Sequence, residues 1–138
     1  MYLIGFPLLV VTFAIYNMIA FLISDDLWTN TITTINLISG KAWTVTPEDI
    51  ILAFAIVLLG IEVIKATRMG IRGLMDHILS MVLFIIMLVE FLLVPRAGTS
   101  TFFILMVISL VDVLAGFIIT ARTAQRDIQI DRTVEPTV

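Results

Sequence analysis

Four acidic residues stand inside long apolar stretches of the sequence, where ionisable side chains are costly and most often functional. They are Glu62, Asp76, Glu90 and Asp112. An acid at membrane depth pairs with a base or a hydrogen-bond donor, or it exchanges protons with water. Each of the four is therefore a candidate for a helix contact or a proton site, and Asp112 falls nearest the middle of its stretch.

Neighbouring basic residues predict ordinary ion pairs for two of these acids. Lys65 follows Glu62 by three residues, with Arg68 nearby, and Arg72 precedes Asp76 by four residues. Residues at these spacings face each other on a helix. We expect structural ion pairs at the membrane surface, with the Lys65 side chain extending outward to water.

Glu90 and Asp112 have no such neighbour. Glu90 lies close enough to the opposite surface to meet water or Arg96. Asp112 has no base at its own depth, which leaves a neutral carboxyl group, a hydrogen bond to Asn17 or Ser80, or a partner from another chain. We expect Asp112 to mark a helix or subunit contact; a proton or cation site is the alternative. For Asn17 we expect an interhelical hydrogen bond.

Small and polar residues recur on one face of each stretch that carries an acid, at about 100° per residue. The faces are Arg72, Asp76, Ser80, Leu83, Met87 and Glu90; Ser109, Asp112, Gly116 and Thr120; and Ala55, Glu62, Lys65 and Ala66. Helices in lipid pack through such faces. A chain this small has few ways to bury three of them alone, so the pattern favours further subunits.

The composition predicts an integral membrane protein. Of the 138 residues, 60% are hydrophobic and 14% charged, against about 45–50% and 25% in soluble domains. The mean hydropathy is +1.14. The net charge of −3 and the scattered basic residues argue against a nucleic-acid partner.

Residue types also argue against most catalytic and cofactor chemistry. The sequence has no cysteine and one histidine, His77, so a thiolate site and a bis-histidine haem within the chain are excluded. No nucleotide loop, HExxH or GxSxG motif is present. We expect no enzyme, metal or cofactor, and for His77 an interfacial polar role. A pigment or haem ligand would require a partner chain to complete its pocket.

Four stretches are long and apolar enough to cross a bilayer, which needs about 20 residues each. They run over about 2–23, 48–67, 72–94 and 101–121. The first lacks basic residues at its start and is expected to be a structural helix, not a cleaved leader. Thr46 before Pro47, Glu48 and Asp49 predicts the start of the second. The fold class is all-α: a single-domain, polytopic four-helix transmembrane bundle over 1–138.

The longest connection, 24–46, is predicted to be a short interfacial helix lying on the membrane. Trp28 and Trp43 flank it and are expected at headgroup level. The tail, 122–138, is polar and expected to be cytoplasmic, with a mobile end.

Basic residues predict the orientation. Lys65, Arg68, Arg72, Arg122, Arg126 and Arg132 fall on one side, and Lys41 and Arg96 on the other. The positive-inside rule then places both termini in the cytoplasm and 24–46 outside, with Lys65, Arg68 and Arg72 as interfacial anchors.

Residues 48–126 resemble the phosphate-starvation-inducible E family of small bacterial four-span membrane proteins. The resemblance rests on Ile61-Glu62-Val63-Ile64-Lys65, a basic start to the third stretch, a short outer loop, and a fourth stretch ending in arginines. It implies a bacterial inner-membrane four-helix protein and no particular chemistry.

These observations predict a non-catalytic accessory or stabilising subunit of a larger membrane complex, such as a respiratory or photosynthetic one. One alternative is a homo-oligomeric channel or proton-coupled transporter, with Asp112, Glu62 and Glu90 as relay positions. Another is a protein that organises lipid or pigment. The expected partners are membrane lipids and other membrane subunits or copies of the same chain.

Overall fold

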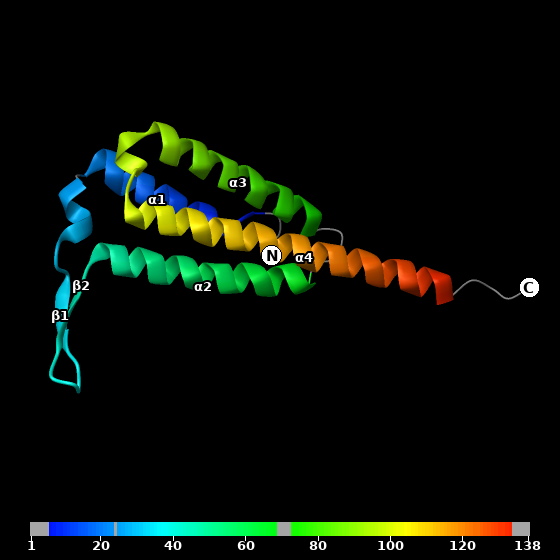
Figure 1. The fold of residues 1–138 in the computed structure, drawn as a ribbon, viewed down its shortest axis with the longest axis horizontal. Coiled ribbons are helices and arrows are strands. Elements are labelled where there is room, and N and C mark those ends of the chain that lie inside the picture. The colour runs from blue at the N-terminus through cyan, green and yellow to red at the C-terminus, as the bar shows by residue number, and fades with distance from the viewer. Residues whose placement is uncertain (1–5, 24, 69–72, 134–138) are drawn as a thin grey trace, which may run out of the picture.

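A computed structural model describes residues 6–23, 25–68 and 73–133, and its main elements are four helices that lie alongside one another (Figure 1). In chain order the elements are α1 (Leu9–Leu22), η1 (Asp25–Thr29), β1 (Thr33–Asn36), β2 (Ala42–Val45), α2 (Pro47–Arg68), α3 (Gly73–Leu93), η3 (Pro95–Ala97) and α4 (Ser100–Thr133). Strands β1 and β2 form a hairpin at one end of the bundle, here called the hairpin end. The end where α2 finishes and α3 begins is called the basic end.

Three of the helices are long and apolar enough to cross a membrane. They are Pro47–Arg68, Leu74–Leu93 within α3, and Ser100–Arg126 within α4. Helix α1 has 14 residues, or about 21 Å at 1.5 Å per residue, which is shorter than the hydrocarbon core of about 30 Å. The structure therefore has the makeup of an integral membrane protein, while the described part of the expected first span, 2–23, forms a shorter helix.

Helix α4 lies at the centre of the bundle. It packs most extensively against α3 and α2, whereas α1 packs mainly on α2 and less on α4. Helices α1 and α3 contact each other little, because each of them packs mainly against other helices of the bundle. The bundle is therefore more closely packed among α2, α3 and α4 than between α1 and α3.

An aromatic cluster fills the core near the hairpin end. Tyr16 stacks on Trp28 with ring centroids 4.8 Å apart and meets Phe102 edge-on at 5.0 Å. The Tyr16 hydroxyl contacts Thr99 Oγ1 at 2.6 Å and donates to the Arg96 carbonyl at 3.2 Å. Trp28 is only 5% exposed, so it is a core residue and not the headgroup-level anchor that the sequence predicted.

Arg96 closes the last turn of α1. Its Nη1 donates to the Ala20 carbonyl at 2.8 Å and reaches the Phe21 carbonyl at 3.5 Å. The guanidinium carbon also lies 5.6 Å from the centroid of the Phe21 ring. A helix end leaves carbonyls without intrahelical partners, and a cation there satisfies them. Arg96 therefore serves α1 and is not the partner proposed for Glu90.

The predicted interfacial helix over 24–46 is wrong, because most of this connection is the antiparallel hairpin of β1 and β2. The segments Thr33–Asn36 and Ala42–Val45 are rich in β-branched residues, which favour strands. Gly40 has φ +85°, a conformation that glycine adopts without steric penalty, and it closes the turn. The tip is held by the Leu37 N–H donating to the Lys41 carbonyl at 2.9 Å.

The ends of α2 and α4 differ in how well the sequence predicted them. Asp49 Oδ2 accepts from both the backbone N–H and the hydroxyl of Thr46, at 3.0 and 3.1 Å, which confirms a capped start at Pro47. Helix α4, by contrast, continues through most of the expected polar tail to Thr133. Its 34 residues measure about 51 Å and extend well past the basic end (Figure 1).

Candidate functional site

Three of the four acids that the sequence predicts at membrane depth converge from three helices toward the basic end. Glu62 of α2, Asp76 of α3 and Asp112 of α4 are each less than a tenth exposed. They surround a cavity of about 30 Å³, here called the polar cavity, which has room for roughly one or two water molecules. The lining residues are Glu62, Lys65, Ala66, Asp76, His77, Ser80, Asp112, Gly116, Ile119 and Thr120.

Lys65 joins two of these acids. Its Nζ lies 3.5 Å from Glu62 Oε1 and 3.2 Å from Asp76 Oδ2, and it donates to the Phe6 carbonyl at 3.0 Å. The predicted Glu62–Lys65 pair is confirmed, but the lysine side chain is only 14% exposed and does not extend to water. Arg72, the predicted partner of Asp76, lies outside the described residues. The lysine therefore links α2 to α3 and to the start of the chain.

Glu62 has a second role at the start of α1. Its Oε1 accepts the backbone N–H of Leu8, the residue that caps this helix. Free N–H groups and the helix dipole make a helix N-terminus a favourable place for a carboxylate. Glu62 and Lys65 together hold residues 6–8 against α2.

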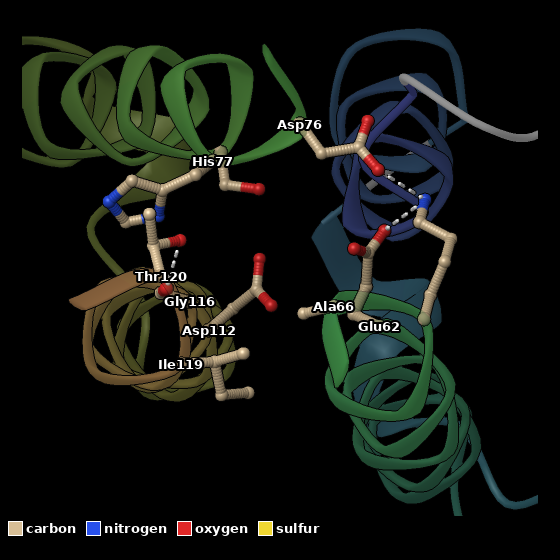
Figure 2. Close-up of a pocket in the computed structure, with 10 residues that line it drawn as sticks. Glu62, Ala66, Asp76, His77, Asp112, Gly116, Ile119 and Thr120 are labelled. Carbon is tan, nitrogen blue, oxygen red and sulfur yellow. Dashed lines mark hydrogen bonds and ion pairs between the residues drawn. The ribbon is translucent and has the colours of Figure 1, made fainter. Parts of the chain in front are cut away.

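Asp112 lies between the three helices, with its carboxyl group pointing into the space among them (Figure 2). Its hydrogen-bond partner is Ser80 of α3, one of the two partners that the sequence proposed. Glu62, Asp76 and Lys65 are close enough to act on its charge. The cavity thus gathers three carboxyl groups and one ammonium group, a set that can hold and exchange protons.

His77 also belongs to this cavity, which the sequence analysis missed. Its ring packs on α4, with the centroid 6.3 Å from that of Phe117. A Cβ added at Gly116 would lie 2.7 Å from His77 Nδ1, so the glycine makes this close approach possible. The helical wheel places His77 about 100° from Asp76, but it does not reveal that α4 fills that side. The tight contact leaves no space for a pigment or haem between His77 and α4.

A second polar pair lies nearer the hairpin end, between α1 and α3. Asn17 Nδ2 donates to Glu90 Oε2 at 3.3 Å, which is the interhelical bond expected for Asn17. Asn17 Oδ1 and Glu90 Oε1 are buried and have no hydrogen-bond partner within the described part of the chain.

This pair borders an open, mostly apolar groove of about 580 Å³, here called the α1–α3 groove. Its lining residues are Asn17, Phe21, Ile85, Ile86, Val89, Glu90, Leu93 and Val94. None of them lines the polar cavity. Between the two sites, Leu83 and Met87 are buried on the same face of α3, so an apolar layer separates the two groups of acids.

The three polar faces meet one another inside a single chain, contrary to the expectation that further subunits would cover them. Asp76 and Ser80 face α2 and α4, and Asp112 faces both neighbours. Ser109, one turn from Asp112, is 1% exposed, and its hydroxyl has no partner among the residues described. Arg68 stays exposed at the last residue of α2.

Metal binding finds no support in the described residues, where no group of three or more His, Asp or Glu side chains could hold an ion. Comparisons with protein-family models, with curated proteins and with solved structures gave no match to this chain. The resemblance of residues 48–126 to the phosphate-starvation-inducible E family therefore stays an expectation, and function has to be inferred from the polar cavity and the α1–α3 groove.

Proposed function

We propose that the chain is a non-catalytic accessory or stabilising subunit of a larger complex in a bacterial inner membrane, with both termini in the cytoplasm. The observation that carries this proposal is the α1–α3 groove, where Asn17 Oδ1 and Glu90 Oε1 are buried without a donor from the described residues. The polar cavity does not carry it, because Lys65 and Ser80 join its acids within the chain, and its two atoms without a partner among the described residues, Asp76 Oδ1 and His77 Nδ1, belong to residues that line a space with room for water.

The groove has the chemistry of an incomplete helix contact. A buried acceptor without a donor costs about 1–3 kcal/mol, and the hydrocarbon region offers little water to supply one. A transmembrane helix that rests on α1 and α3 would cover the apolar walls. A hydroxyl, amide or ammonium group on that helix would donate to the two free oxygens.

Isolation from native membranes tests this proposal. A chain with an affinity tag at its C-terminus is extracted in a mild detergent, and the proteins that accompany it are quantified by mass spectrometry. We expect a membrane protein at fixed stoichiometry. Glu90→Gln should weaken its retention, because a donor amide then competes with the partner's donor. Glu48→Gln, the same change in the first turn of α2, is the matched control.

Two results would contradict the accessory role. One is recovery of the wild-type chain as a monomer with no stoichiometric companion. The other is a companion held equally well by the Glu90→Gln and Glu48→Gln variants, which would place its contact away from the groove. Recovery as a discrete homo-oligomer would instead favour a homo-oligomeric channel or transporter.

The second candidate is a homo-oligomeric channel or proton-coupled transporter, and the polar cavity favours it. Three carboxyl groups around a space that admits water could exchange protons from the basic end. Transport would also require the layer of Leu83 and Met87 to open toward Glu90, because the cavity and the groove are separate.

Proton flux into vesicles tests the second candidate. The purified chain is reconstituted with a pH-sensitive dye inside, and an imposed potential drives protons. Asp112→Asn keeps an acceptor for Ser80 but cannot exchange a proton, so it should abolish the flux. Equal flux in the wild-type and Asp112→Asn chains, or none in either, would exclude a proton path through Asp112.

A further inference from the structure

The hairpin is exposed along almost its whole length. Every residue from 31 to 44 is exposed, although the segment contains several large apolar side chains. Ile35 and Trp43 are 44% and 46% exposed, and Ile38 at the tip is 109% exposed. A two-stranded hairpin is at best marginally stable alone in water, so a surface that covers these side chains is required.

The strand register separates the hairpin into two unlike faces. Directly paired residues lie on the same face, and the faces alternate along each strand. One face carries the pairs Thr33–Val45 and Ile35–Trp43, and the other carries Thr34–Thr44 and Asn36–Ala42. The first face is therefore mainly apolar and the second mainly polar. This pattern is typical of an amphipathic element at an interface between an apolar phase and water.

The direction of the hairpin identifies that interface. In Figure 1 the hairpin runs across the direction of the helices. Where the long helices cross the membrane, a segment that runs across them lies along the membrane surface and does not project from it. An apolar groove of about 260 Å³ descends from Ile32 and Pro47 at the base of the hairpin to Phe54 of α2, so the hairpin continues the lipid-facing surface.

We propose that the hairpin is a membrane-surface anchor that lies on the outer leaflet of the same bilayer. Its face with Ile35, Trp43 and Val45 lies in the headgroup region, where tryptophan is favoured. The face with Thr34 and Thr44 lies toward water. Lys41, next to the turn, can reach lipid phosphates while its stem covers apolar surface. This anchor acts whether or not a partner occupies the α1–α3 groove.

Tryptophan fluorescence tests the proposal, because the chain has two tryptophans and one is buried. Trp28→Phe leaves Trp43 as the single reporter and keeps an aromatic ring against Tyr16. The full chain is reconstituted in phosphatidylcholine vesicles whose acyl chains are brominated near the headgroup. Bromolipid should lower the Trp43 emission about twofold or more, as expected for an indole at the interface, and aqueous acrylamide should quench it weakly.

The matched control moves the reporter by one residue to the other face. In the Trp28→Phe, Trp43→Thr, Thr44→Trp variant, acrylamide should quench strongly and bromolipid weakly. If Trp28→Phe does not fold, the same exchange of positions 43 and 44 in a chain that keeps Trp28 gives the difference between faces. Strong acrylamide quenching of Trp43 without bromolipid quenching would overturn the lipid contact. Equal or reversed quenching of the two reporters would overturn the assignment of faces.

Discussion

The polar cavity and the α1–α3 groove both bury carboxyl groups within the apolar part of the bundle, yet only at the polar cavity do the acids share a cation. Each site also holds two buried polar atoms without a partner among the described residues, and those of the polar cavity, Asp76 Oδ1 and His77 Nδ1, belong to residues that line a space with room for water. At the cavity, Lys65 bridges Glu62 and Asp76, and Ser80 binds Asp112. At the groove, Asn17 donates to Glu90, and one acceptor on each residue has no donor in the part of the chain that the structure describes.

Helix packing explains this difference better than residue type. Helices α2 and α3 both pack against α4, so side chains from three helices meet at the polar cavity. Helix α1 is short, and its own partners are mainly α2 and α4, so its face toward α3 is incompletely filled. The molecule is closed where three helices meet and open where two helices approach each other without a third.

Lys65→Met should have the largest effect on stability, because it removes the cation that the closed site depends on. Breaking a buried ion pair by deleting one partner typically costs about 3–5 kcal/mol, and here two acids lose their partner together. We expect the free energy of unfolding, measured in mixed detergent micelles, to fall by about this amount. Arg68→Met removes an exposed cation one turn further along α2 and should change it little. Similar losses in the two variants would show that Lys65 acts only through net charge.

Gly116→Ala should have an intermediate effect and should test whether α3 and α4 pack as closely as the site requires. The added Cβ would lie 2.7 Å from His77 Nδ1, so the ring or the helix must shift. Overpacking of this kind costs about 1–3 kcal/mol. Gly60→Ala is the matched control, since a Cβ on that helical glycine meets nothing within 4 Å. It should be neutral or stabilise by about 0.5–1 kcal/mol. Equal stability of the two variants would mean that His77 does not rest on Gly116.

The sequence predicted the parts of this fold that depend on helical period and composition. The apolar stretches became helices, Glu62 and Lys65 paired at i and i+3, and the polar residues of α2, α3 and α4 turned toward protein. Each of these follows from residues on one helix. The position of His77 did not follow, because it depends on where α4 lies relative to α3.

The connection between α1 and α2 shows a different limit. Its apolar residues fit a helical face and a β-hairpin about equally well, and the helix was the wrong choice. The β-branched content of residues 33–36 and 42–45, with Gly40 between them, was the signal that could have corrected it. Trp28 was misplaced for a related reason, since composition does not tell a headgroup tryptophan from one that stacks on Tyr16.

Glu90→Gln should have the smallest effect on the isolated chain, and with the opposite sign to the other two. The glutamine oxygen can still accept from Asn17 Nδ2, and its amide can donate to Asn17 Oδ1, so the free acceptors on both residues disappear. One added hydrogen bond contributes about 0.5–1.5 kcal/mol, and we expect the free energy of unfolding in micelles to rise by up to this amount.

The same substitution should weaken the native assembly, because the amide then occupies the acceptor that a partner's donor would use. A site that is complete by itself loses stability when altered, whereas a site completed by another chain can gain stability alone and lose it in the complex. If Glu90→Gln destabilises the isolated chain as much as Lys65→Met, the α1–α3 groove is already closed from within and needs no partner helix.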